Sequence, residues 1–130
     1  MLESMPMGLV IVRARISSRK KATVDFLVDT GATYTVIPPA LAKRIGATPS
    51  SERFRVTLAD GRSMRLGACL VGIELAGRRG PTTALVLPGA EPLLGAETLE
   101  ALGLRVDPSR RRVEPSRSRA AVLVGVRLSR

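Results

Sequence analysis

One segment reads Phe26-Leu27-Val28-Asp29-Thr30-Gly31-Ala32-Thr33, so that an acid follows three apolar residues and precedes a hydroxyl and a glycine. The apolar run predicts the end of a strand, which puts Asp29 at the edge of the core. There the ionised carboxylate loses hydration, so a neighbouring group can tune its protonation. Gly31 permits a sharp turn that leaves backbone N–H groups free to hydrogen-bond the carboxylate, and Thr30 can fix the loop. Asp29 is therefore the first candidate for chemistry, the alternative being an ordinary turn cap.

Short apolar runs rich in β-branched residues extend in both directions from this segment. We expect strands at residues 9–16, 22–28, 54–58, 64–66, 69–75, 82–87, 104–106 and 112–114, with a turn over residues 77–80. Residues 38–46 begin with proline and end with glycine, which predicts a short helix. A second helix is predicted over residues 96–102, closed by Gly103. This order predicts a mostly β protein, a small antiparallel barrel-like domain with one or two short helices.

The predicted strands at residues 54–58 and 64–66 are joined by Ala59-Asp60-Gly61-Arg62. An Asp-Gly pair between alternating strands is a strong short-range signal for a hairpin. We therefore expect a projecting hairpin, in which Asp60 caps the turn as Asp107 is expected to do in its own turn.

The composition suits one small domain with few aromatic side chains. Hydrophobic residues make up 45% of the 130 residues and aromatic residues only 2%, so small branched side chains must fill the core. We expect residues 1–115 to form the domain. Residues 116–130 form an arginine-rich joint followed by an apolar segment with strand character.

Several classes of chemistry are excluded by the residue counts. The chain has no histidine and one cysteine, Cys69, which excludes imidazole-based catalysis and zinc sites built from histidine or several cysteines. Carboxylate chemistry, a Ser–Lys pair or an oxygen-ligated metal would remain, but Ser17, Ser18, Lys20 and Lys21 lie in a predicted solvated turn where lysine keeps its proton. A lone thiol fits a reducing compartment, and no apolar run is long enough to span a bilayer. The cytoplasm, without a membrane partner, is the expectation.

Three elements in this order resemble the retropepsin-like aspartic proteases. The first is Val28-Asp29-Thr30-Gly31-Ala32-Thr33, similar to the hydrophobic-Asp-Thr-Gly-Ala motif of that family. The second is the hairpin of residues 56–64, in the position of the flap that closes over substrate, and the third is Pro92-Leu93-Leu94-Gly95 with the helix that follows it. The resemblance extends roughly over residues 9–114 and implies a small closed antiparallel β-barrel-like acid-protease fold.

The resemblance implies an aspartic endopeptidase that hydrolyses polypeptide substrates without a metal or cofactor. In this class two carboxylates face each other across a two-fold axis, one accepting a proton from water while the other donates one. The chain carries a single Asp-Thr-Gly, so the resemblance implies a homodimer in which Asp29 and its symmetry mate are the catalytic pair. We expect residues 116–130, with the segment near residues 5–10, to contribute strands to the dimer interface.

Further site residues are implied by the same resemblance. Thr30, Gly31, Leu93, Leu94 and Gly95 would support the site, with Thr30 bonding across the interface. Extended substrate would lie beside Ala32, Ala59, Asp60 and Gly61. The chain departs from the viral enzymes in two ways: the hairpin tip is not glycine-rich, and Thr33 replaces an acid, which removes an expected salt bridge.

Two other functions remain open from the sequence. A net charge of +10 would attract a nucleic acid, and arginines crowd near the C-terminus at Arg105, Arg110, Arg111, Arg112, Arg117 and Arg119. Against this, the chain has no tryptophan, one tyrosine and two phenylalanines, which gives no evident stacking platform for single strands. The third possibility is a dimer that keeps the fold as an interaction module without activity.

Overall fold

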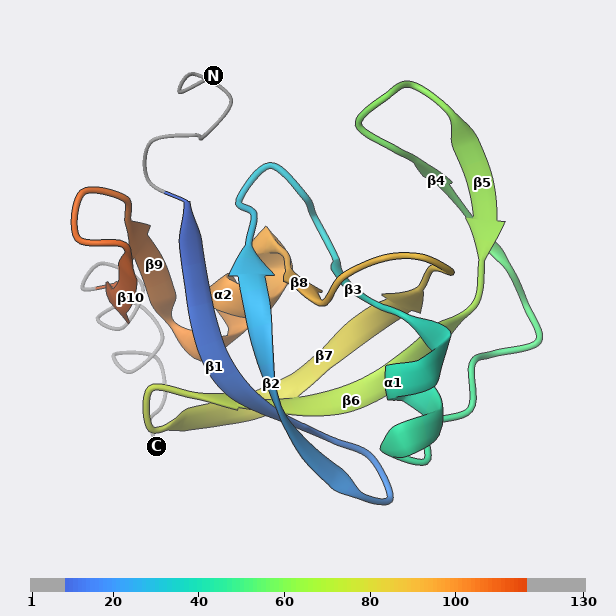
Figure 1. Cartoon of the computed structure of the whole chain (residues 1–130), viewed down its shortest axis with the longest axis horizontal. Coiled ribbons are helices and arrows are strands. Elements are labelled where there is room, and N and C mark those ends of the chain that lie inside the picture. The colour runs from blue at the N-terminus through green and yellow to red at the C-terminus, as the bar shows by residue number, and fades with distance from the viewer. Residues whose placement is uncertain (1–8, 117–130) are drawn as a thin grey trace, which may run out of the picture.

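Strands dominate the computed structural model, which describes residues 9–116 (Figure 1). The strands are β1 (Val10–Ser17), β2 (Lys21–Val28), β3 (Thr35–Ile37), β4 (Phe54–Thr57), β5 (Ser63–Leu66), β6 (Ala68–Leu75), β7 (Arg78–Val86), β8 (Leu93–Leu94), β9 (Leu104–Asp107) and β10 (Arg112–Pro115). The helices are α1 (Pro39–Arg44) and α2 (Ala96–Leu102). The expected mostly β class with short helices is confirmed. The interface segments expected before residue 9 and after residue 116 lie outside the described residues.

Six strands form a closed barrel in the order β1-β2-β8-β3-β7-β6. The ring closes where β1 pairs with β6 over Arg15, Ile16 and Ser17. Most neighbours are antiparallel, as expected, but β2 pairs with β8 and β3 with β7 in parallel. Each parallel pair joins strands that are far apart in the chain, with residues 38–77 between β3 and β7 and residues 29–92 between β2 and β8, so neither pair is joined by a hairpin turn.

The strand β7 starts earlier than the sequence predicts. We expected a turn over residues 77–80, yet Leu75 already pairs with Arg78. The turn is the two-residue pair Ala76 and Gly77, with φ of 55° and 76°. Two successive positive φ angles are typical of the tight turn that suits the right-handed twist of a hairpin. Gly80 therefore lies in β7 and not in the turn.

The core is filled by small branched side chains from every strand of the barrel, as the composition predicts. Its largest fully buried side chains include Phe26, Ile16, Ile37, Ile45 and Ile73. In β6 the residues Cys69, Val71, Ile73 and Leu75 face inward, while the residues between them face outward. Burial raises the pKa of the Cys69 thiol, so this thiol is a poor nucleophile.

The helix α2 ends where the sequence predicts, whereas α1 is shorter than the predicted residues 38–46, because Pro38 and Ile45 are its caps. Proline opens α1 at its first position. Gly103 closes α2 with φ of 68°. Beyond that cap, the Arg78 guanidinium donates hydrogen bonds to the carbonyl oxygens of Leu102 and Gly103 at 3.0 and 3.1 Å. A cation is favourable at the negative end of a helix, so Arg78 ties β7 to α2.

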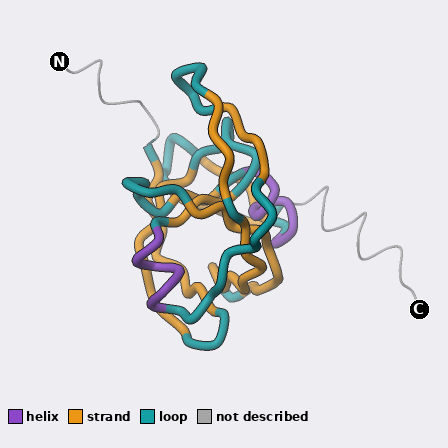
Figure 2. Tube along the Cα trace, turned by 90° about the vertical axis from the view of Figure 1, so that its right-hand side faces the viewer, coloured by secondary structure: helices purple, strands orange, loops and turns teal. Residues whose placement is uncertain are grey.

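Two hairpins lie outside the barrel. β9 and β10 pair with each other, and Asp107 accepts hydrogen bonds from the backbone N–H of Ser109 and Arg110 in their turn. The second hairpin, β4 with β5, extends away from the barrel in both views (Figures 1 and 2). Its inner face carries Val56, Met64 and Leu66, which are less exposed than their neighbours. This projecting hairpin is the element that the sequence predicts as a flap.

Candidate active site

Asp29 lies in a tight loop directly after β2, and backbone groups hold it from two sides. Its Oδ1 accepts a hydrogen bond from the Gly31 N–H at 2.9 Å, and its carbonyl oxygen accepts one from Ala32 at 3.1 Å. Its own N–H donates to the Leu94 carbonyl oxygen at 2.9 Å. A Cβ at position 31 would lie only 3.2 Å from Asp29 Oδ1. The glycine therefore allows the close approach of its N–H to the carboxylate.

The segment Leu93-Leu94-Gly95 supports this loop from beside it. Leu93 and Leu94 form β8, which pairs in parallel with the last two residues of β2. Gly95 packs directly on the backbone of Tyr34, where an added Cβ would lie 2.5 Å from the carbonyl carbon and oxygen. Real side chains do not tolerate that distance, so only glycine fits at this crossing.

The start of α2 completes the support of the Asp29 loop. The N–H of Ala96 donates to the Ala32 carbonyl oxygen at 2.7 Å, and the N–H of Glu97 donates to the Thr33 carbonyl oxygen at 3.0 Å. These donors have no partner within the helix itself. The loop carbonyls therefore cap α2, and α2 holds the loop in return.

A chain of three buried threonine hydroxyls lies behind the loop. Thr98 Oγ1 of α2 lies 2.6 Å from Thr35 Oγ1 of β3 and 2.6 Å from Thr82 Oγ1 of β7. Thr35 Oγ1 also accepts a hydrogen bond from the Gly95 N–H at 3.3 Å. All three side chains are at most 6% exposed. The threonine chain, which the sequence analysis did not identify, thus links the support of Asp29 to the barrel wall.

A cleft of about 760 Å³ lies between the Asp29 loop and the projecting hairpin. Asp29, Gly31 and Ala32 line its floor, Leu93 lines its side, and residues 55–59 of the hairpin line the part opposite the floor. Further residues of its lining were not predicted from the sequence, among them Leu27, Tyr34, Val36, Arg55, Leu85, Leu87 and Glu91. Tyr34 and Val36 follow the Asp-Thr-Gly motif in the chain, which was the available signal for them. The cleft thus brings the predicted catalytic acid and the predicted flap together.

The hairpin tip is a compact turn, and only part of it lines the cleft. The N–H of Leu58 donates to the Arg62 carbonyl oxygen at 2.7 Å, and Gly61, with φ of 90°, donates to the Leu58 carbonyl oxygen at 2.9 Å. Asp60 accepts from the Arg62 N–H at 3.0 Å and from its guanidinium at 2.7 Å. These bonds lower the pKa of Asp60, the backbone N–H of Arg62 being the main cause. Ala59 lines the cleft whereas Asp60 and Gly61 do not, so their contact with substrate stays a prediction.

In the single chain, Asp29 and Thr30 are exposed to solvent. The apolar run before Asp29 predicts a carboxylate that loses hydration at the edge of the core, but in the single chain the Asp29 side chain stays exposed. The reason is geometric, because the loop turns away from the end of β2 and only backbone groups approach the carboxylate. Within residues 9–116 the Thr30 hydroxyl has no hydrogen-bond partner, and the Asp29 carboxylate has only the Gly31 N–H. Both side chains are therefore available to a second surface.

A six-stranded barrel that carries Asp-Thr-Gly at the floor of a hairpin-covered cleft defines a retropepsin-like aspartic protease. A sequence model described as aspartyl protease matches residues 12–98, more than half of the chain. The chain belongs to this aspartyl protease family. Comparison with curated proteins finds no significant match.

Among solved structures, the chain is similar to the EIAV protease in complex with the inhibitor HBY-793. The TM-score is 0.64 at 22% sequence identity, over 76% of this chain and 92% of the viral one. The likeness shows a shared fold. Family and fold together support a protease function. Neither helix in the described part of the chain is long and apolar enough to cross a membrane.

Proposed function

We propose that the protein is an aspartic endopeptidase that works as a homodimer, with Asp29 of each chain forming the catalytic pair. The observation that carries this proposal is the exposed Asp29 carboxylate, held by the Gly31 N–H on the floor of a cleft beneath the projecting hairpin. Family membership supports the reaction class. Floor residues and residues 55–59 of the hairpin line opposite parts of the cleft, so an extended peptide between them could pair with the chain by main-chain hydrogen bonds.

The need for a second chain follows from the acids in the cleft. Asp29 and Glu91 are the carboxylates in its lining, and only Asp29 is fixed on the floor by backbone hydrogen bonds. Activation of water requires one ionised carboxylate to take a proton and one protonated carboxyl to donate to the substrate carbonyl. A two-fold related copy supplies an identical second acid. It would also cover Asp29 and remove water from it, which the single chain does not do.

In the proposed dimer the two acids share one proton, because two adjacent carboxylates cannot both ionise at low cost, an effect well established for this enzyme class. The ionised member takes a proton from water as the oxygen attacks the peptide carbonyl carbon. The protonated member donates to the carbonyl oxygen, which gives a tetrahedral gem-diol. The first acid then passes the proton it took from water to the amide nitrogen, and the C–N bond breaks. The second acid takes back a proton from a gem-diol hydroxyl, so that the products are a carboxylic acid and an amine and the pair again holds one proton. The exposed Thr30 hydroxyls would bond across the interface and hold the two loops together.

The test is cleavage of fluorescein-labelled casein between pH 3 and pH 8 by the wild type, Asp29→Asn and a matched control, Asp25→Asn. Asp25 lies on the outer face of β2 and pairs with Arg13 at 3.1 Å with both side chains largely exposed, so its loss costs little. We expect an acid-shifted optimum in the wild type and the control, and loss of at least about 1,000-fold in Asp29→Asn. Cleavage that survives Asp29→Asn would refute the proposal.

The dimer is tested separately by dilution. The rate per chain should fall once the protein concentration passes below the dissociation constant that sedimentation velocity gives for the dimer. A constant rate per chain across that range would refute the shared site. A stable dimer that cleaves no substrate at any pH would instead support an interaction module with this fold.

A further inference from the structure

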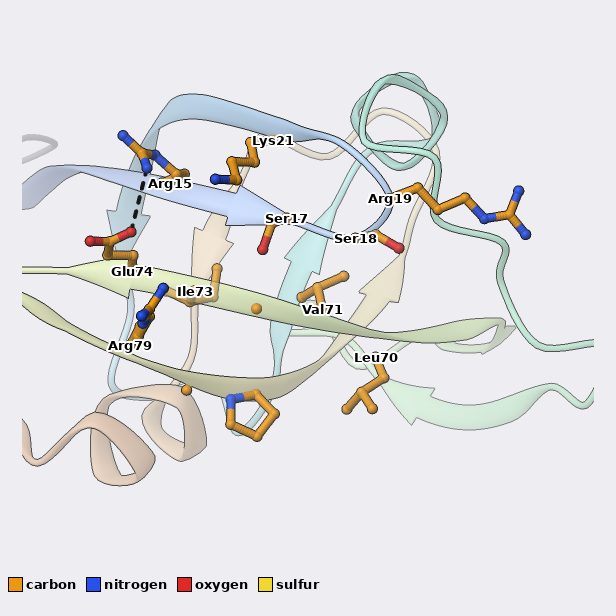
Figure 3. A pocket seen from close by; sticks show the side chains of 13 residues that line it. Arg15, Ser17, Ser18, Arg19, Lys21, Leu70, Val71, Ile73, Glu74 and Arg79 are labelled. Atoms are coloured by element: carbon orange, nitrogen blue, oxygen red, sulfur yellow. Dashed lines mark ion pairs between the residues drawn. The ribbon is translucent and has the colours of Figure 1, made fainter.

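A second hollow lies on the outer face of the barrel, over the four neighbouring strands β2, β1, β6 and β7 (Figure 3). Its volume is about 610 Å³, and it shares no lining residue with the cleft at Asp29. Lys21 stands at the start of β2 and Asp29 just after its end. Eight residues of strand separate the two by roughly 25 Å, so both sites could be occupied at once.

The pairing register shows how the hollow arises. Ser17 of β1 pairs with Lys21 on one side and with Gly72 on the other, and Gly72 pairs with Pro81 of β7. Residues paired across strands share one face of the sheet, so this outward row holds a glycine at its centre. The Ser17 hydroxyl lies over it, since a Cβ at position 72 would be 2.9 Å from Ser17 Oγ. The floor of the hollow therefore carries the Ser17 hydroxyl beside a residue without a side chain, and Ser18 adds a second hydroxyl to the lining.

The next row supplies the charge around that floor. Arg15 of β1, Glu74 of β6 and Arg79 of β7 are directly paired neighbours across the sheet. The carboxylate of Glu74 lies 3.7 Å from the Arg15 guanidinium. Within residues 9–116, neither Arg79 nor Lys21 forms an ion pair. The hollow thus presents three cations, from Arg15, Arg79 and Lys21, against one acid, whereas Arg19 points away from it (Figure 3).

We propose that this hollow binds the phosphate backbone of a nucleic acid. In protein–DNA complexes, guanidinium, ammonium and hydroxyl groups donate hydrogen bonds to the phosphate oxygens. Lys21 and Arg79 lie three strand spacings apart, roughly 14 Å, which is too far for one free phosphate to bridge and suits two separate, non-adjacent phosphates of a backbone. The net charge of +10 adds long-range attraction. No aromatic side chain lines the hollow, so binding is through the backbone and is independent of base sequence.

The test uses the full-length chain and a fluorescein-labelled 20-base-pair duplex DNA, with binding followed by fluorescence anisotropy over a salt series. The double variant Lys21→Gln/Arg79→Gln should lower the slope of log K against log salt by about 2 and weaken binding by roughly ten-fold at low salt. The matched control is Lys43→Gln/Arg44→Gln, two exposed cations on α1 away from the hollow. It should change binding by less than about two-fold.

Glu74→Gln is expected to strengthen binding of the duplex, and an unfolded variant could not produce that change. Removing this acid should tighten binding by about two- to five-fold. Casein cleavage and circular dichroism of the charge variants check that their fold and cleft are intact. Asp29→Asn should bind the duplex as the wild type does, although it no longer cleaves casein.

Three results would overturn the proposal. If both double variants lost the same affinity, binding would come from the overall positive charge of the chain and not from the hollow. Displacement of the duplex by polyglutamate of the same charge would assign the hollow to an acidic polypeptide. Displacement by inorganic phosphate at constant ionic strength would assign it to a single small anion.

Discussion

Replacement of Thr98 by valine should destabilise the protein through the hydroxyls it leaves behind. Valine has the shape of threonine and a similar helix propensity, so packing in α2 is preserved. The change removes the two 2.6 Å contacts that Thr98 Oγ1 makes with Thr35 and Thr82. Each hydrogen bond contributes about 1 kcal/mol, and a buried hydroxyl without a partner costs about a further 1–3 kcal/mol. Thr35 keeps the Gly95 N–H, so we expect a loss of about 3 kcal/mol.

The matched variants separate hydrogen bonding from packing. Thr82→Val alone removes one bond while Thr98 keeps Thr35, so the expected cost is about 1 kcal/mol. The double variant Thr82→Val/Thr98→Val leaves no orphaned hydroxyl at position 82, so its cost should be about 2 kcal/mol, well below the sum of the single changes. Urea denaturation at one fixed protein concentration measures all three values. If the cost of the double variant equals the sum of the two single-variant costs to within about 0.5 kcal/mol, the hydroxyl chain is refuted.

Two further changes test the support of the site and one turn outside it. Gly95→Ala would place a methyl group 2.5 Å from the Tyr34 carbonyl, so we expect the free energy of unfolding in urea to fall by about 4 kcal/mol or more. The control Gly80→Ala, whose nearest contact would be at 3.6 Å, should cost less than about 1 kcal/mol. Equal costs for the two variants would contradict the close approach at Gly95. Hydrogen bonds from Ser109 and from the backbone N–H of Arg110 lower the pKa of Asp107 below its ordinary value of 3.8, so the folded state favours the ionised carboxylate. This contribution to the free energy of unfolding is present above pH 3.8 and is lost as the pH falls through the lower pKa of the folded state. Asp107→Asn should therefore reduce the drop in stability between pH 6 and pH 3, and an unchanged drop would show that the turn does not hold the ionised carboxylate.

Elements with local signals were predictable from the sequence. The proline at the start of α1 and the glycine after α2 act within one turn of chain, and the alternation along β6 is visible in eight residues. β3 and β8 were missed as strands because they are three and two residues long. They are strands only because they pair with distant partners, β7 and β2. No window of sequence contains that information.

The threonine chain was beyond the sequence for the same reason. Thr35, Thr82 and Thr98 stand in three different elements, separated by up to 63 positions. A single threonine in a strand is typical of an exposed β-former. Only the closed barrel brings the three hydroxyls together.

The position and the surroundings of Asp29 have different physical origins. Its position comes from local groups, since the Gly31 N–H holds Oδ1 and the Leu94 carbonyl holds its N–H. These bonds form within one chain, which is why the motif predicts the loop well. Its surroundings depend on what covers the open side of the cleft, and one chain leaves that carboxylate in water. In the proposed mechanism a second acid shares a proton with Asp29, and a second surface has to bring that acid. The dependence of the rate on protein concentration therefore tests the mechanism more directly than the fold does.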